Sequence, residues 1–286
     1  MPEPLAGALA TATAAWPGPA AAGVVSEAGV EASSGPVERA FPWASVTKLL
    51  VALACLVAWE EETVDMDDAV GPPGSTLAHL LAHASGLPFE GTQPIAPAGR
   101  RRIYSNTGLE LAAHHLEARS GIHFGDYLRT GVLDPLAMNA TSLEGSPAHG
   151  AIGPLVDLMA LAGELVRPTL VSGTTLRTAT SVAWPGLAGV LPGFGRQDPC
   201  DWGLGPEIRD HKSPHWTGTR NSPSTFGHFG QSGALLWVDP DAGVALAALS
   251  GTTFGPWAVA AWPALSDAVI SHWTAPPAAP GPAQPA

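Results

Sequence analysis

The segment from Ala44 to Glu62 is the feature that most constrains the fold of this chain. Its sequence, ASVTKLLVALACLVAWEEE, is apolar on almost every face that a helix could present. A helix without a polar face must be covered on all sides, so this pattern predicts a helix at the centre of a domain. The uninterrupted apolar run, Leu49–Trp59, is much shorter than the roughly 20 residues that span a bilayer. We therefore expect no membrane insertion.

Strand-like patterns lie toward the two ends of the chain, and helical patterns lie mostly between them. Residues 20–33 predict a hairpin, and four short apolar segments after residue 200 predict further strands, two of them joined by the turn Asp239–Gly243. A helix is also expected after Gly74, with Ser75 as its N-cap. The remaining predicted helices cover residues 4–15, 106–120, 124–133, 155–166 and 256–273.

This order of elements predicts a mixed α/β (α+β) fold. Strands from the two chain ends pair in a mostly antiparallel sheet, and a helix from each end packs on it. We expect one domain over 1–273, with a sheet region (1–43 and 195–273) and an inserted all-helical region (44–194). Residues 274–286 are rich in Pro and Ala and are expected to be a disordered tail.

Charge and composition exclude several classes of function. The chain has 13 basic and 25 acidic residues, a formal net charge of −12, which argues against non-specific nucleic-acid binding. No Lys or Arg precedes Arg39, so a basic signal-peptide start is missing and we expect a cytoplasmic protein. His79 and His83 could pair on a helix, but no third ligand is apparent, and nucleotide-binding fingerprints are absent. We expect no metal and no cofactor.

Ser45 and Lys48 form the first motif that carries chemistry. They are separated by one helical turn, so the two side chains lie on one face at the start of the apolar helix. An adjacent amine can take the proton of a serine hydroxyl and make it an effective nucleophile. Only one other lysine occurs, Lys212, and chance placement would give about 0.13 Ser-x-x-Lys pairs in a chain of this composition.

Two further motifs follow in order along the chain. Tyr104–Ser105–Asn106 contains one of only two tyrosines, and chance would give about 0.02 Tyr-x-Asn pairs. His228–Phe229–Gly230 is a weaker signal, because about one His-x-Gly is expected by chance and a second copy begins at His123. We prefer the His228 copy because it lies in a strand-like segment that a hairpin follows.

Together these motifs resemble those of the serine β-lactamase and penicillin-binding-protein superfamily. The resemblance is greatest to the branch with class C β-lactamases, D-aminopeptidases and β-lactamase-like esterases, and it covers roughly residues 18–273. It extends to LLAHASGLP (80–88), VLDPLAMNATSL (132–143) and GHFGQSGALLWVDPDAGVALAALS (227–250), in the order that the family has. The resemblance implies a β-lactamase/transpeptidase-like fold.

The resemblance also implies roles for the residues of the first two motifs. Ser45 would be the nucleophile that forms an acyl-enzyme, and Lys48 would activate it. Tyr104 would move protons, first as base and then as acid. Asn106 would hold Lys48 and a substrate carbonyl.

The resemblance implies that the third motif, His228–Phe229–Gly230, completes the site. His228 stands where many relatives have lysine. Gly230 precedes Gln231, whose backbone N–H, on a strand, would form an oxyanion hole with the N–H of Ser45. Phe229 departs from the family pattern, since relatives usually have a Thr or Ser hydroxyl there that helps to bind a substrate carboxylate.

These observations predict a serine hydrolase for a small-molecule ester or amide, and the missing hydroxyl at Phe229 favours a carboxylesterase. A β-lactamase or a D-amino-acid-specific peptidase or amidase is the alternative. Acyl transfer to a small acceptor, instead of hydrolysis, stays open. A non-catalytic binding or scaffold protein on the same fold is the alternative of another class, and the three intact motifs argue against it.

Overall fold

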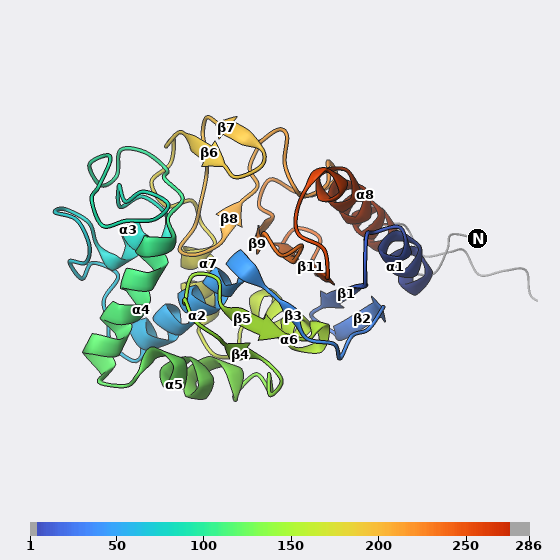
Figure 1. The fold of residues 1–286 in the computed structure, drawn as a ribbon, viewed down its shortest axis with the longest axis horizontal. Coiled ribbons are helices and arrows are strands. Elements are labelled where there is room, and N and C mark those ends of the chain that lie inside the picture. Colours follow the sequence, from blue (N-terminus) through green and yellow to red (C-terminus); the bar gives the residue numbers. More distant parts are fainter. Residues whose placement is uncertain (1–4, 275–286) are drawn as a thin grey trace, which may run out of the picture.

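The main sheet has six antiparallel strands, which come from both ends of the chain as predicted (Figure 1). The computed structural model describes residues 5–274. The strand order is β2-β1-β11-β10-β9-β8, so the N-terminal hairpin continues directly into the C-terminal strands. The strand bounds are β1 (Ala20–Ser26), β2 (Gly29–Ser34), β8 (Glu207–Ile208), β9 (Phe226–Phe229), β10 (Leu235–Asp239) and β11 (Val244–Ser250).

Strands β1 and β11 are neighbours in the interior of this sheet and are buried on both faces. They pair along their whole length, from Ala20 opposite Ser250 to Ser26 opposite Val244, and every residue of both is buried. Their sequences are therefore continuously apolar or small rather than alternating. A Cβ on Gly23 would lie 2.2 Å from the sulfur of Met159, so this glycine allows a helix to pack closely on the strand.

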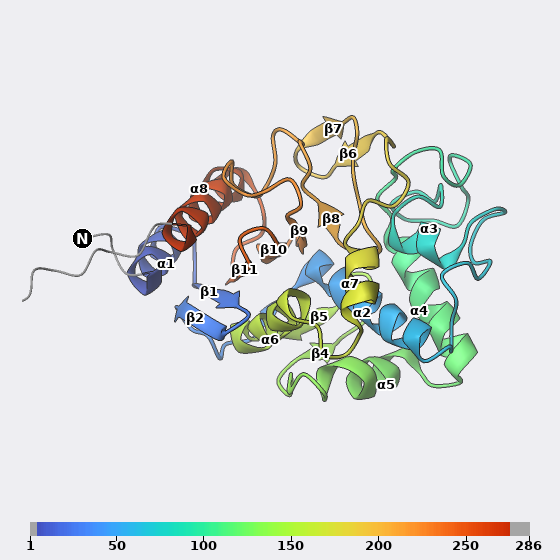
Figure 2. The ribbon, with the colours of Figure 1, turned by 180° about the vertical axis from the view of Figure 1, so that it is seen from behind.

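Helices cover the two faces of the sheet. The predicted terminal helices, α1 (Leu5–Ala14) and α8 (Pro256–Trp273), lie side by side on one face (Figures 1 and 2). On this face the indole N–H of Trp237 in β10 donates a 3.0 Å hydrogen bond to the hydroxyl of Ser266 in α8. Helix α6 (Leu155–Val166) packs against β1, β10 and β11 from the other face.

The apolar segment 44–62 forms the central helix of the helical region. A short 3-10 turn, η1 (Ala44–Val46), leads into α2 (Thr47–Glu60), and α2 is buried from Thr47 to Ala58. All-round burial agrees with the all-round apolar sequence. The surrounding helical elements are α3 (Leu77–Leu81), α4 (Asn106–Ser120), α5 (Phe124–Leu128), the π-helical turn η2 (Arg129–Leu133) and α7 (Gly173–Ala179).

The prediction of an all-helical middle region was wrong in detail. Strands β3 (Phe41–Pro42), β5 (Ala151–Gly153) and β4 (Ser142–Leu143) form a small sheet, and β6 (Gly189–Leu191) pairs with β7 (Gly195–Gln197). Strands of two or three residues have too few side chains to show a period of two, which is why the sequence pattern did not reveal them.

Two other predictions need correction. The N-cap of α3 is Thr76 and not Ser75, because the Thr76 hydroxyl is the one that accepts from a backbone N–H of the first turn. The strand predicted over 201–208 shortens to β8, because the chain turns at Gly205, where a Cβ would lie 2.2 Å from the Cβ of Ala52.

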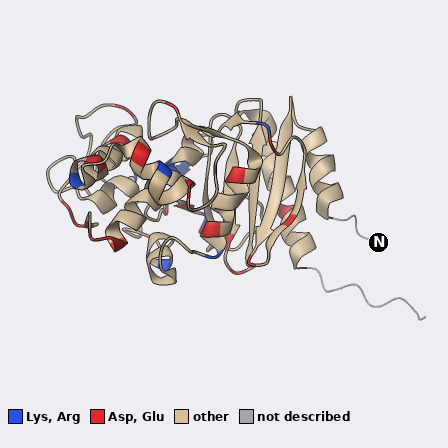
Figure 3. Cartoon of the chain, turned by 90° about the horizontal axis from the view of Figure 1, so that it is seen from below, with Lys and Arg blue, Asp and Glu red and all other residues tan. Residues whose placement is uncertain are grey.

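Acidic side chains are distributed over both the sheet region and the helical region, and basic side chains are fewer (Figure 3). Within residues 5–274, no helix is both long and apolar enough to cross a membrane. The Pro/Ala tail predicted over 274–286 lies outside the described residues, apart from Thr274.

Candidate active site

The turn that carries Ser45 is pressed between two strands. Ala44 has a positive φ of 45°, a conformation that is strained for a residue with a side chain. The backbone N–H of Trp43 donates to the carbonyl of Ala151 in β5 at 2.8 Å. On the other side, a Cβ on Gly230 would lie 2.3 Å from the carbonyl oxygen of Trp43. Gly230 therefore lets the end of β9 approach the Ser45 turn.

Lys48 is fully buried and has only uncharged hydrogen-bond partners. Its Nζ lies 3.2 Å from Ser45 Oγ, 2.7 Å from Asn106 Oδ1 and 2.9 Å from the carbonyl oxygen of Ala148. Burial lowers the pKa of Lys48 to about 7, and the charge of Glu110 only partly opposes this. A neutral amine, with a lone pair beside Ser45, is therefore well populated near neutral pH.

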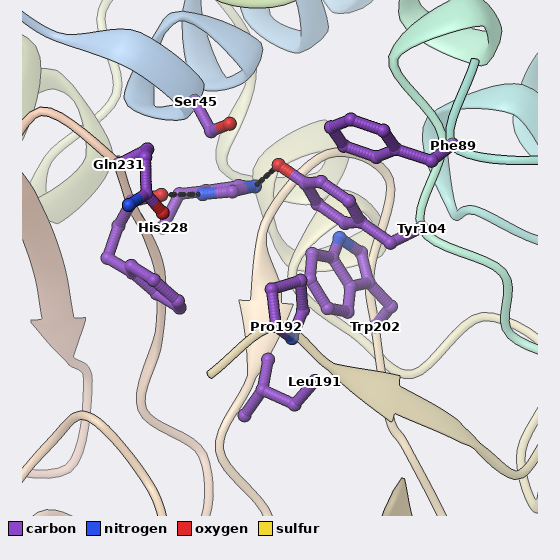
Figure 4. Close-up of a pocket in the computed structure, with 9 residues that line it drawn as sticks. Ser45, Phe89, Tyr104, Leu191, Pro192, Trp202, His228 and Gln231 are labelled. Carbon is purple, nitrogen blue, oxygen red and sulfur yellow. Dashed lines mark hydrogen bonds between the residues drawn. The ribbon is translucent and has the colours of Figure 1, made fainter. Parts of the chain in front are cut away.

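Tyr104 and His228 face each other across the same site (Figure 4). The Tyr104 hydroxyl lies 3.4 Å from Nε2 of His228, and Nδ1 of His228 lies 2.7 Å from the carbonyl oxygen of Phe229. Since a carbonyl can only accept, Nδ1 carries the proton and Nε2 is the acceptor. Burial, followed by the charge of Lys48, lowers the pKa of His228 to about 3, so the imidazole is neutral.

The phenol of Tyr104 is protonated in the resting site. Burial raises its pKa, and a hydrogen bond with Ser45 opposes this only in part. The Tyr104 hydroxyl thus carries a proton in the resting site. The ammonium form of Lys48 would also interact with this ring, because Nζ lies 4.8 Å from the ring centroid.

The segment 83–89 holds Tyr104 and Asn106 in place. The backbone N–H of Ser105 donates to Nδ1 of His83 at 3.2 Å, and the N–H of Asn106 donates to the carbonyl of Phe89 at 2.8 Å. The His83 ring also packs on the Tyr104 ring, with a centroid distance of 4.5 Å. Sequence reasoning noted this segment only as part of a family resemblance and missed its positioning contacts.

A cavity of about 160 Å³ opens beside Ser45, Tyr104 and His228 (Figure 4). Its remaining walls are mostly apolar or aromatic and come from loops and strand ends far apart in the chain. They are Phe89, Leu191, Pro192, Trp202, Phe229 and Gln231. Four of them, Phe89, Leu191, Pro192 and Trp202, were not predicted as site residues, because no local pattern says which loops meet at the cavity.

The two residues that were predicted to supply the oxyanion hole are among those that line this cavity. Ser45 and Gln231 both line it, and within residues 5–274 neither of their backbone N–H groups donates a hydrogen bond. Gln231 lies in the turn after β9 and not on a strand as predicted, because Gly230 already pairs with Ala234 to close the hairpin. The carbonyl of Gln231 accepts from the N–H of Phe254 at 2.9 Å, which fixes this turn.

The predicted alternative of a histidine pair for a metal is not assembled. Nδ1 of His79 lies 2.9 Å from the hydroxyl of Thr76 at its own helix cap. Nδ1 of His83 is occupied by the backbone of Ser105. Among the described residues, no group of three metal-ligating side chains comes together.

Comparison with known proteins identifies the family. The family model described as Beta-lactamase matches residues 21–269, almost the whole described chain. The chain belongs to the β-lactamase family. This confirms the family resemblance, and with it the mixed α and antiparallel-β fold, that the motifs predicted.

Individual members and neighbours of the β-lactamase family show how far the similarity extends. A crystal structure of a β-lactamase from Mycobacterium bovis is 52% identical, with a TM-score of 0.90 over 92% of this chain and 98% of that one. The structure of EstCE1, a hydrolase with promiscuous acyltransferase activity, has a TM-score of 0.72 over 88% of this chain and 93% of that one. Its identity is 16%, so this likeness shows the fold alone.

A curated β-lactamase-family relative matches over a smaller region. Penicillin-binding protein 4* of Bacillus subtilis (strain 168) is 29% identical over 134 residues. The match covers 35% of this chain and 30% of that protein, so it spans less than a third of the relative's length.

Proposed function

We propose that this protein is a carboxylesterase that works through an acyl-enzyme on Ser45. The observation that carries the proposal is the environment of Lys48: a buried amine, 3.2 Å from Ser45 Oγ, with no carboxylate among its hydrogen-bond partners. Burial without a counter-ion favours the neutral amine, which is the form that can accept a proton from serine. A buried lysine with a purely structural role is normally paired with a carboxylate.

Acylation follows from the geometry of the resting site. The Lys48 amine takes the proton of Ser45 Oγ as this oxygen attacks the ester carbonyl. The backbone N–H groups of Ser45 and Gln231 bind the negative oxygen of the tetrahedral intermediate. When the intermediate collapses, the Tyr104 phenol donates its proton to the leaving alcohol and regains one from the Lys48 ammonium. The products of this step are the acyl-enzyme on Ser45 and the free alcohol.

Deacylation runs through the same groups in reverse, with water in place of the alcohol. A proton passes from water through Tyr104 to Lys48 while the water oxygen attacks the acyl carbonyl, and it then returns to Ser45 Oγ. His228, with its Nε2 lone pair toward the Tyr104 hydroxyl, orients the phenol but is too weak a base to hold the proton. Asn106 keeps the Lys48 amine in place throughout.

The walls of the cavity favour a neutral ester over a carboxylate-bearing substrate. Within the described residues that line it, none is Lys or Arg, and His228 is neutral. The Phe229 ring packs among other aromatic rings, including Phe254 with a centroid distance of 5.1 Å, and offers no hydroxyl to an anion. A β-lactam carboxylate would lose its hydration here without a charged partner.

Nitrophenyl esters of increasing acyl length test the proposal, with Ser45→Ala as the key variant. We expect measurable turnover by the wild type, loss of about 10³-fold or more in Ser45→Ala, and no change in Ser33→Ala, an exposed serine on β2. A fluorophosphonate should add its mass to Ser45 only. Equal turnover by wild type and Ser45→Ala, or labelling of another residue, contradicts the proposal.

β-Lactam hydrolysis is the second candidate function. The observation that favours it is the 52% identity to a Mycobacterium bovis structure described as a β-lactamase. A chromogenic cephalosporin separates the two candidates. Turnover of the cephalosporin that exceeds that of every ester would replace the esterase proposal. Absence of both cephalosporin turnover and a penicillin adduct on Ser45 would exclude this second candidate.

A further inference from the structure

A second cavity of about 290 Å³ adjoins the reaction cavity. The two share the side chains of Phe89, Tyr104 and Pro192 as walls. The second cavity continues outward past Tyr104 between the loop with Ile95 and the strand with Val190. We call it the outer groove. Since Tyr104 is the proposed proton donor to the leaving alcohol, the outer groove lies on the leaving-group side of the site.

Exposed apolar side chains gather around the outer groove. Phe89, Ile95 and Val190 are 53%, 65% and 60% exposed. They are half of the large apolar side chains that are strongly exposed among the described residues; the others are Val30, Ile122 and Val259. Isolated apolar residues on a surface need no explanation, but three around one groove indicate a ligand that covers them.

One cation on the groove wall is free to meet an anion. Arg101 lines the groove, is exposed, and has no acidic partner within residues 5–274. The guanidinium of Arg102, its neighbour, is instead buried and donates to backbone carbonyls, among them those of Ala82 and Cys200. The reaction cavity offers no such cation, so an anionic group would be recognised at the outer end only.

We propose that the outer groove binds the alcohol part of the ester, and that this part is an extended apolar chain with an anionic group at its far end. This inference rests on the proposed function. The ester carbonyl lies at Ser45, the apolar chain passes Phe89 and Pro192 and covers Val190, and the anion meets Arg101. The same groove would hold an acceptor alcohol if acyl transfer replaces hydrolysis.

Acetate esters that differ only in the alcohol test the inference: methyl acetate, octyl acetate and 8-acetoxyoctanoate. Wild type should prefer octyl acetate over methyl acetate by about tenfold or more in kcat/KM, and 8-acetoxyoctanoate over octyl acetate by about two- to fivefold. Val190→Asp should lower the octyl-to-methyl ratio about tenfold, and Arg101→Gln should remove the preference for the carboxylate.

Two matched variants serve as controls. Val30→Asp changes the same residue type at the same 60% exposure, on β2 at the far edge of the sheet. Arg100→Gln removes the neighbouring exposed arginine, which does not line the groove. Both should keep the wild-type ratios. The inference is overturned if Val190→Asp and Val30→Asp have equal ratios, or if Arg101→Gln and Arg100→Gln do.

A binding measurement separates failure of this inference from failure of the proposed esterase. Calorimetry of 8-hydroxyoctanoate, the alcohol product, with the Ser45→Ala protein requires no turnover. Binding that weakens about tenfold on adding Val190→Asp, but not Val30→Asp, supports the groove even if no ester is hydrolysed. Absence of binding, or equal binding in both double variants, overturns the inference even if short esters are hydrolysed.

Discussion

The two lysines of the chain are both buried, yet the structure gives them opposite surroundings. Lys48 is completely covered and meets a hydroxyl, a side-chain amide and a backbone carbonyl. Lys212 is 4% exposed, and its Nζ lies 3.3 Å from Oε1 of Glu207 and 2.8 Å from the carbonyl oxygen of Asp201. One lysine has no carboxylate partner, and the other has one.

This difference in partners decides what each lysine can do. Burial alone would raise the pKa of Glu207, but its neighbours His215 and Lys212 hold it at about 2, so this carboxylate is ionised. It also accepts a 2.6 Å hydrogen bond from the indole of Trp216. Lys212 is thus fixed as one half of an ion pair, whereas Lys48 can give up its proton. Burial makes a lysine reactive only where no anion compensates it.

Replacing each lysine with methionine, which has a similar shape, should separate these roles, and Lys48→Met should show the largest effect. We expect ester kcat/KM to fall about 10³-fold or more, because no other group near Ser45 can take its proton. Unfolding in urea should show a smaller loss, about 1–3 kcal/mol, from leaving Asn106 Oδ1 and the Ala148 carbonyl without a donor. Retention of a tenth of the activity would refute the role of Lys48.

Lys212→Met should act on stability instead. It leaves the Glu207 carboxylate buried with one cation fewer, and we expect the free energy of unfolding to fall by about 3–5 kcal/mol. The fraction of Lys212→Met protein that is folded should have a kcat/KM within a few-fold of the wild-type value. The double variant Lys212→Met with Glu207→Gln is the control, since it removes both charges and should recover part of the loss. A smaller loss than that of Lys48→Met would contradict the comparison.

The contrast also shows what the sequence could and could not predict. Ser45 and Lys48 are one turn apart on a helix whose all-round apolarity predicts burial, so local spacing was enough to place them together. Tyr104 and His228 lie far away along the chain, and only the order of motifs in a known family placed them at the same site.

No such signal existed for Lys212 or for the four cavity walls that were not predicted. Lys212 meets Glu207 because the loop after β8 folds back on that strand, and a loop of this kind carries no periodic pattern. Leu191 and Pro192 reach the cavity from the hairpin β6–β7, whose strands of three residues were not predicted. Which group lies beside a buried charge depends on the tertiary fold. The hydrogen-bond and ion-pair partners of the two lysines therefore could not be predicted without the structure.

The pH dependence of activity should follow Lys48. Its amine is protonated below its pKa of about 7 and cannot then accept the Ser45 proton. We expect kcat/KM to rise about tenfold for each pH step of one below 7 and to level off above it. His228, with a pKa of about 3, and Tyr104, whose pKa is raised, do not titrate in this range. A profile that is flat or falls between pH 6 and 8 would contradict this assignment.

The smallest expected effect concerns Glu110, a carboxylate that acts on Lys48 through its charge without a hydrogen bond to Nζ. Its charge raises the pKa of Lys48 against the larger lowering by burial. Glu110→Gln keeps an acceptor for the Ser146 hydroxyl, which now donates to Oε1 at 2.6 Å, but removes the charge. The acid limb of the kcat/KM profile should therefore move to lower pH, with activity at pH 6 raised about twofold. Glu27→Gln, in the exposed turn between β1 and β2, should leave the limb in place. An acid limb that stays in place or moves to higher pH would contradict its assignment to the Lys48 amine, and the distinction from Lys212 would be lost.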